Sequence, residues 1–99
     1  MQINPMCEIF GGGSEWTVVN SSLKYRIVSG VVYVYVRTGT AGMWENTGSI
    51  PSDVAPEENI YLTFYSDGSN FSIATINTAG NVLSLATLAV NGIFSYPLK

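Results

Sequence analysis

Apolar and polar residues alternate most regularly in the segment Lys24 to Arg37, where two short runs are joined by Ser29-Gly30. A period of two residues is typical of a β-strand, and Ser-Gly suits a tight turn, so the segment predicts a β-hairpin. After the turn, Val32, Val34 and Val36 fall on one face. We expect these three valines to lie in a hydrophobic core.

The opposite face of the second run carries Tyr33, Tyr35 and Arg37. Tyrosines with an apolar ring and a polar tip are enriched in surfaces that meet a partner or a ligand. The whole chain is 11% charged and 46% hydrophobic, which is too little charge to cover an ordinary soluble monomer. We therefore expect self-association and predict that Tyr33, Tyr35 and Arg37 form an oligomer interface.

Similar short runs follow one another from Trp16 onward, and no window shows a sustained helical period. Turn-forming residues separate them, and Asn91-Gly92 is the strongest hairpin signal among these. The pattern predicts an all-β chain, folded as an antiparallel β-sandwich of about seven to nine short strands. The runs are Trp16 to Val19, Leu23 to Val28, Val31 to Arg37, Ile60 to Tyr65, Phe71 to Ile76, Val82 to Leu85 and Ile93 to Tyr96.

The 99 residues suit one folded domain. Residues 1–14 are predicted to be an N-terminal arm and a Gly-rich hinge, and residues 15–99 the β-sandwich head domain. The stretch from Thr38 to Asn59 is long for a connection. Its apolar anchors Met43, Trp44 and Ile50 predict that it packs, with a short strand around Gly42 to Glu45 and another before Pro51.

The formal charge of -3 argues against nucleic acid as a partner, because the four scattered cations give no basic stripe. No run approaches the length of a membrane span, and the N-terminus lacks a secretion signal, so we expect neither membrane insertion nor export. Cys7 is the one cysteine and cannot form an internal disulfide. This suits synthesis in a reducing cytoplasm.

The chain has few of the side chains that enzymes commonly use in catalysis, because it contains no histidine and one cysteine. These absences remove Ser-His and Cys-His pairs and zinc sites built on imidazole or thiolate groups. Seven carboxylates remain, but Glu57 and Glu58 are adjacent and point apart if extended. We expect no enzymatic activity, no cofactor and no metal site.

Exposed aromatic residues are the best candidates for binding. Trp44 lies in the long loop, and Tyr65 ends a strand beside the turn that contains Asp67 and Asn70. Aromatic faces next to small polar side chains suit saccharide or protein surfaces. Trp44, Tyr65, Asp67 and Asn70 are therefore the predicted receptor-binding residues, and structural packing is the alternative role for each aromatic ring.

Several segments, in this order, resemble the C-terminal receptor-binding or head domains of bacteriophage tail fibres and baseplate proteins, which also occur in prophages. Ser52 to Ala55, between two prolines, departs from the loop pattern of that family. The matching segments are Tyr25-Arg26 with Gly30 and the alternating valines, Ile50-Pro51 and Pro56, Ile76 to Val82, and Phe94-Ser95-Tyr96.

This resemblance implies a homotrimer at the tip of a virion tail that binds a host-surface glycan or protein without a cofactor. Residues 1–10 would then pair with a neighbouring subunit or join the head to a stalk protein. The alternative is a purely structural trimerisation or capping module, in which the aromatic residues are all interface. A glycan-depolymerising enzyme is a third, less favoured possibility.

Overall fold

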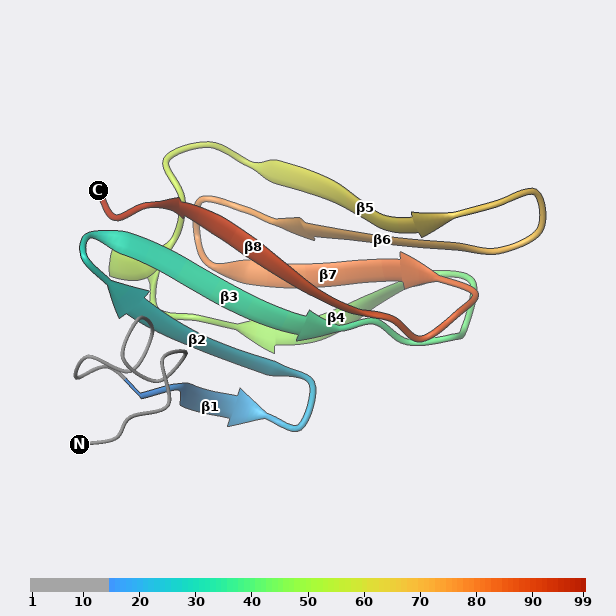
Figure 1. The fold of residues 1–99 in the computed structure, drawn as a ribbon, viewed down its shortest axis with the longest axis horizontal. Coiled ribbons are helices and arrows are strands. Elements are labelled where there is room, and N and C mark those ends of the chain that lie inside the picture. The colour runs from blue at the N-terminus through green and yellow to red at the C-terminus, as the bar shows by residue number, and fades with distance from the viewer. Residues whose placement is uncertain (1–14) are drawn as a thin grey trace, which may run out of the picture.

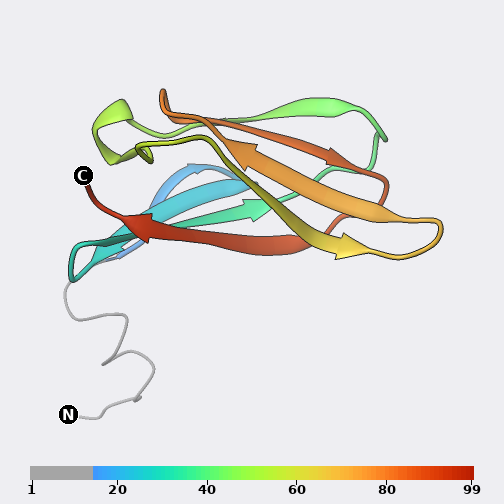
Figure 2. The same cartoon turned by 90° about the horizontal axis from the view of Figure 1, so that it is seen from above.

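The computed structural model describes residues 15–99, which form two antiparallel four-stranded sheets packed face to face (Figures 1 and 2). The predicted all-β fold is confirmed at this level. The predicted arm and hinge, with Cys7, lie outside the described residues. The strands are β1 (Thr17–Asn20), β2 (Leu23–Val28), β3 (Val31–Arg37), β4 (Trp44–Ser49), β5 (Ile60–Ser66), β6 (Phe71–Ile76), β7 (Asn81–Ala86) and β8 (Asn91–Pro97), with a 3-10 turn η1 (Ser52–Val54).

The first sheet, sheet A, has the strand order β1-β2-β3-β8, and the second, sheet B, has the order β4-β7-β6-β5. The chain therefore builds three strands of sheet A, crosses to complete sheet B, and returns with β8 (Figure 1). No helix among residues 15–99 is long and apolar enough to cross a membrane.

The hairpin β2-β3 agrees with its sequence pattern. Ser29 and Gly30 both have positive φ angles, 52° and 78°, which suits the two-residue turns that match strand twist. Val32, Val34 and Val36 are fully buried, at 0% exposure. The predicted valine face is thus the inner face of sheet A.

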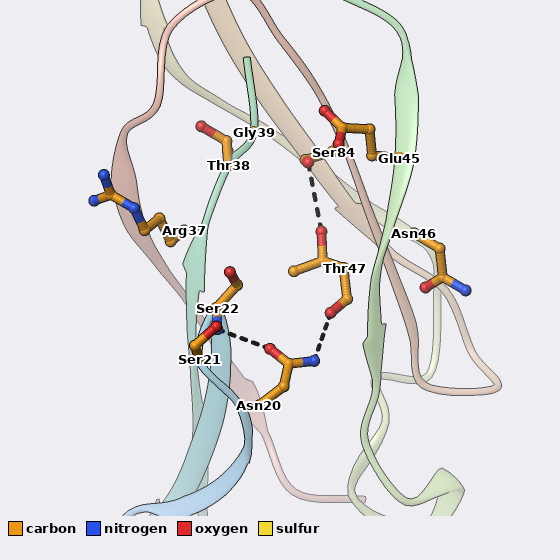
Figure 3. Close-up of a pocket in the computed structure, with 10 residues that line it drawn as sticks. All are labelled: Asn20, Ser21, Ser22, Arg37, Thr38, Gly39, Glu45, Asn46, Thr47 and Ser84. Carbon is orange, nitrogen blue, oxygen red and sulfur yellow. Dashed lines mark hydrogen bonds between the residues drawn. The ribbon is translucent and has the colours of Figure 1, made fainter. Parts of the chain in front are cut away.

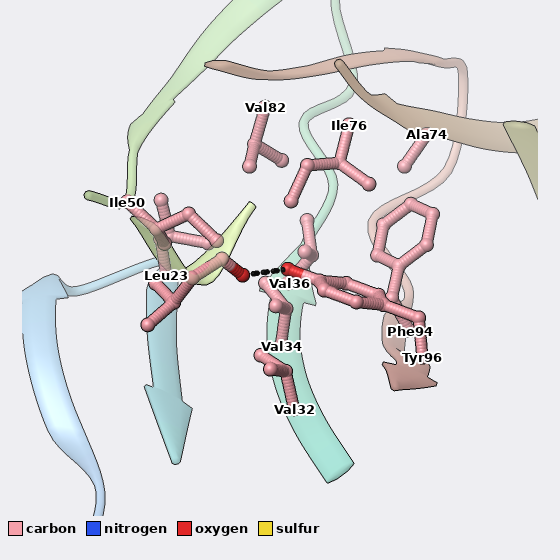
Figure 4. Packing of buried hydrophobic residues seen from close by; sticks show 11 residues of the cluster. Leu23, Val32, Val34, Val36, Ile50, Ala74, Ile76, Val82, Phe94 and Tyr96 are labelled. Carbon is pink, nitrogen blue, oxygen red and sulfur yellow. Dashed lines mark hydrogen bonds between the residues drawn. The ribbon is translucent and has the colours of Figure 1, made fainter. Parts of the chain in front are cut away.

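The core fills the layer between the sheets with side chains from both (Figure 4). Phe94 of β8 is fully buried and meets the edge of the Phe64 ring, with 5.7 Å between ring centroids. Tyr96 enters the same layer and donates a hydrogen bond of 2.7 Å to the carbonyl oxygen of Val54 in η1. The buried phenol thereby joins β8 to the loop that precedes β5.

Two parts of the chain differ from the predicted pattern. Asn91-Gly92, predicted to form a turn, instead begins β8, where the two residues pair with Arg37 and Val36 of β3. The Phe64 ring lies against Gly92 and leaves no room for a Cβ atom. The glycine is needed for close packing rather than for a turn. The two short strands predicted around Gly42 to Glu45 and before Pro51 are instead one strand, β4, which forms an edge of sheet B.

Candidate functional site

The four predicted receptor-binding residues lie at opposite edges of sheet B. Trp44 begins β4, whereas Tyr65 lies near the end of β5. Two strands separate these edges, so the residues are three strand spacings apart, roughly 14 Å. Trp44 is 49% exposed and Tyr65 is 39% exposed. The structure does not bring Trp44 together with the other three.

Tyr65, Asp67 and Asn70 do come together in the β5-β6 turn. The Tyr65 hydroxyl donates to the Asp67 carboxylate at 2.6 Å, and the backbone amides of Ser69 and Asn70 donate to it at 2.7 Å each. The bond from Tyr65, followed by those from the two amides, lowers the pKa of Asp67. Contact with Asp67 in turn raises the pKa of Tyr65. The Asp67 carboxylate therefore stabilises the turn through these three hydrogen bonds.

The predicted interface residues lie on the outer face of sheet A, as expected from the alternation. Tyr35 meets the edge of the Trp16 ring at 6.4 Å between centroids. The ammonium group of Lys24 lies 4.8 Å from the Tyr35 centroid and 5.0 Å from the Trp16 centroid. Arg37 is exposed and donates to the Asn91 side-chain oxygen at 3.1 Å. This face presents aromatic rings and cations, and its role as an oligomer interface stays a prediction.

A polar cleft that the sequence did not predict lies where the end of β3 approaches the edge strand β4 (Figure 3). Its volume is about 320 Å³. Both sheets contribute to it, through the β1-β2 turn and the end of β3 on one wall, and through β4 and β7 on the other. The lining residues are Asn20, Ser21, Ser22, Arg37, Thr38, Gly39, Glu45, Asn46, Thr47 and Ser84.

Hydrogen bonds hold the two walls of the cleft at a fixed separation. The Asn20 side-chain amide donates to the Thr47 carbonyl at 2.8 Å, and its oxygen accepts from the Ser22 amide at 2.7 Å. On the other wall, the Thr47 hydroxyl donates to the Ser84 hydroxyl at 3.4 Å. Asn20 therefore bridges sheet A to sheet B at the mouth of the cleft.

The floor of the cleft continues into a buried polar network. Thr38 is 2% exposed, and its hydroxyl lies 2.7 Å from that of Ser72, which is fully buried. The Thr38 hydroxyl oxygen also accepts from the Val90 amide at 2.9 Å. This network fixes the chain where it leaves β3.

The Glu45 carboxylate is the one charged group that faces the cleft, whereas the Arg37 side chain points away from it, toward the outer face of sheet A (Figure 3). Glu45, on β4, accepts from the Ala41 amide at 3.4 Å and packs against Gly39, where a Cβ atom would collide with the carboxylate. Arg37 stands at the end of β3. A ligand in the cleft meets the Glu45 carboxylate as its one charged acceptor, beside neutral hydroxyls and amides.

The cleft can bind a molecule that both donates and accepts hydrogen bonds along its length. Serine and threonine hydroxyls do both, asparagine amides offer a donor and an acceptor, and Glu45 adds one strong acceptor. Glu45 is the one carboxylate in the lining. Nowhere in the described residues do three or more His, Cys, Asp or Glu side chains gather in a way that could hold a metal ion.

One signal for the cleft was present in the sequence. In β7 the alternation places Ser84 on the same face as Val82 and Ala86, which means that a hydroxyl points inward. A polar residue at an inward position indicates a buried network or an accessible cavity. The other lining residues could not be assigned in this way, because they belong to segments far apart along the chain.

A second, smaller cleft of about 290 Å³ lies at the far end of the sandwich, between residues 56–60 and the end of β8. Its lining is more apolar and contains Glu57, Glu58 and Lys99. Comparison of the chain with protein families, with curated proteins and with solved structures found no match.

Proposed function

We propose that this chain is a non-catalytic adhesion domain of a phage tail appendage, which assembles as a homotrimer and binds a host-surface saccharide. The observation that carries the saccharide part is the cleft of about 320 Å³ between β3 and β4, which is lined by hydroxyls and amides beside one carboxylate. The low charge of the chain, 11%, supports self-association. No cofactor, nucleic acid or membrane insertion is part of this proposal.

A saccharide suits the cleft because each of its hydroxyl groups both donates and accepts a hydrogen bond. The lining offers the complementary groups on two walls that Asn20 holds together. Binding without hydrolysis is favoured, because glycosidases use a pair of carboxylates flanking the bond and the lining provides Glu45 alone.

Trp44 extends the proposed site beyond the cleft. It precedes Glu45 on β4, so its side chain points to the other face of this edge strand. Because β4 is at the edge of sheet B, a saccharide leaving the cleft could pass over the strand and meet the half-exposed indole. The Tyr65-Asp67-Asn70 turn lies at the opposite edge and would contact a separate part of a large receptor.

The test is binding of the purified protein to a glycan array and to host cells, comparing Glu45→Gln with Glu15→Gln. Both variants lose one negative charge, but Glu15 is exposed and does not line the cleft. We expect Glu45→Gln to weaken binding about tenfold or more, since a charged hydrogen bond is lost, and Glu15→Gln to bind as the wild type does. Equal binding by the wild type and Glu45→Gln would exclude the cleft as the site.

The alternative function is a structural module that holds a tail component together. It is favoured by the outer face of sheet A, where Trp16, Lys24 and Tyr35 already form an ordered cluster ready to meet a protein surface. In that case the wild type would bind no glycan. Tyr35→Ala and Trp44→Ala would both reduce the oligomer to smaller species, with no separate binding defect.

A further inference from the structure

The four edge strands of the sandwich are not alike. In β1 the pairing register shifts between Val18 and Asn20, in β4 between Asn46 and Gly48, and in β5 between Thr63 and Tyr65. β8 is the exception, because it pairs with β3 without interruption from Val31↔Pro97 to Arg37↔Asn91. A bulge bends an edge strand and disturbs its outer row of hydrogen-bonding groups, which discourages a further strand from pairing.

Within the described residues, β8 also lacks the charged side chains and the internal proline that protect many edge strands. Its seven residues, Asn-Gly-Ile-Phe-Ser-Tyr-Pro, contain no charged side chain, and the one proline stands at the end. Ile93 points outward and is 51% exposed. A regular, uncharged edge of this length is the kind of strand to which another strand adds.

The direction of the free backbone groups follows from the hydrogen bonds at the two ends of the β3-β8 pair. Thr38 N–H donates to the Val90 carbonyl at 2.9 Å, and Leu98 N–H donates to the Gly30 carbonyl at 2.8 Å. The antiparallel pattern repeats every second residue, so the even-numbered residues of β8 face β3. The backbone groups of Asn91, Ile93 and Ser95 therefore face the open edge.

We infer that this edge binds β8 of a second copy of the chain in an antiparallel arrangement centred on Ile93. Ile93 would then lie opposite Ile93 of the second copy, and Asn91 opposite Ser95, each pair exchanging two hydrogen bonds. The two copies of sheet A would join into one continuous sheet.

A second copy is favoured over a foreign strand because β8 is complementary to itself in this register. No charges are brought together, since the strand has none. The exposed Ile93 side chains cover each other across the pair. Pro97, which has no N–H to donate, falls outside the paired residues, so every outward N–H of the strand finds an acceptor.

This pairing has twofold symmetry and is independent of the saccharide cleft and of the proposed trimer. If no trimer forms, the particle contains two copies of the chain, and if the trimer also forms, it contains six. A particle of one or of three copies means that the β8 edge is unpaired. The mass therefore tests this inference separately from the proposed function.

The experiment measures the mass of the full chain by light scattering from about 1 µM to 1 mM, where small interfaces dissociate. Two variants break the pairing. Ser95→Pro removes an outward N–H without touching the bonds to β3, and Ile93→Lys places charges opposite each other. Val18→Lys is the control, because Val18 is 67% exposed on the bulged edge strand β1.

We expect a wild-type mass of two or six copies, a halved mass for Ser95→Pro and Ile93→Lys, and an unchanged mass for Val18→Lys. Circular dichroism confirms that each variant is folded. Should both variants unfold, amide exchange of the wild type decides, since the Ile93 and Ser95 amides must become protected as concentration rises. A wild-type mass of one or three copies, or unprotected amides at high concentration, overturns the inference.

Discussion

The space between the two sheets has two parts of different character. Around Val34, Ile76 and Phe94 it is filled with apolar side chains that are fully buried (Figure 4). Toward the end of β3 it is lined by hydroxyls, where Thr38 and Ser72 are equally buried but bonded to each other. Inward-facing positions of the same strands thus form a closed core in one part and the floor of an open cleft in the other.

The difference shows that one stretch of each strand buries apolar side chains, whereas another stretch presents polar groups for binding. Apolar burial contributes about 25 cal/mol per Å² and needs no partner of fixed geometry. A buried hydroxyl stabilises the fold only while its hydrogen bonds are made. The apolar part can therefore carry the stability, which allows the polar part to keep the Glu45 carboxylate available to a ligand.

The largest expected loss of stability comes from removing a large side chain from the apolar part. Phe94→Ala removes a fully buried ring and its contact with Phe64, so we expect the free energy of unfolding to fall by about 3–5 kcal/mol. Chemical denaturation measures it. Val18→Ala, at a position that is 67% exposed, is the control and should change stability by less than about 0.5 kcal/mol. A loss from Phe94→Ala as small as that of the control would contradict this division of the interior.

An intermediate effect is expected from the polar part. Thr38→Val keeps the shape of the side chain but leaves the Ser72 hydroxyl and the Val90 amide without their partner, which should cost about 1–3 kcal/mol in unfolding free energy. Thr63→Val, on the exposed side of β5, is the matched control and should be nearly neutral. If Thr38→Val proved as stable as the wild type, the network would contribute nothing and the comparison would fail.

The smallest effect is expected at the exposed polar turn, outside both parts. The pKa of Asp67 in the folded protein is lowered from 3.8. The hydrogen bonds to the ionised carboxylate therefore stabilise the turn fully above pH 3.8, and this stabilisation is lost as the pH falls through the lower, folded-state pKa. Acid should therefore release the Ser69 and Asn70 amides locally, without unfolding the sandwich. Amide chemical shifts followed by NMR during an acid titration measure this, with Asp67→Asn as the reference. A midpoint at or above pH 3.8 would show that the hydrogen bonds to the carboxylate do not form in solution.

The apolar part was predictable from the sequence, and the polar part was not. Strict alternation in β3 identified Val32, Val34 and Val36 without knowledge of their partners, because the strand period alone decides which side is buried. The cleft depends on Asn20, Glu45 and Ser84 meeting across two sheets. No local pattern encodes that meeting, since it results from the crossing of the chain after β3.

The errors at individual strands have equally physical causes. Asn91-Gly92 has the composition of a turn, but the space that Gly92 leaves is taken by the Phe64 ring of the other sheet. β4 was predicted as two short strands, because its polar residues and its bulge between Asn46 and Gly48 hide the alternation. The sequence correctly predicted that Tyr65 and Asp67 are neighbours, because they flank one turn. Their separation from Trp44 could not be predicted, because it depends on the order of the strands in sheet B.

The pairing of β3 with β8 has a consequence for the order in which the chain folds. The β2-β3 hairpin closes a two-residue turn, whereas the β3-β8 pair joins Val31 to Pro97. Closing the longer loop costs more chain entropy, so β8 is expected to arrive late. Before β8 pairs with it, the valine-rich β3 is an unpaired edge strand with an exposed apolar face. Unpaired edges and exposed apolar surface of this kind promote aggregation during folding. We expect the docking of β8 on β3 to close this edge.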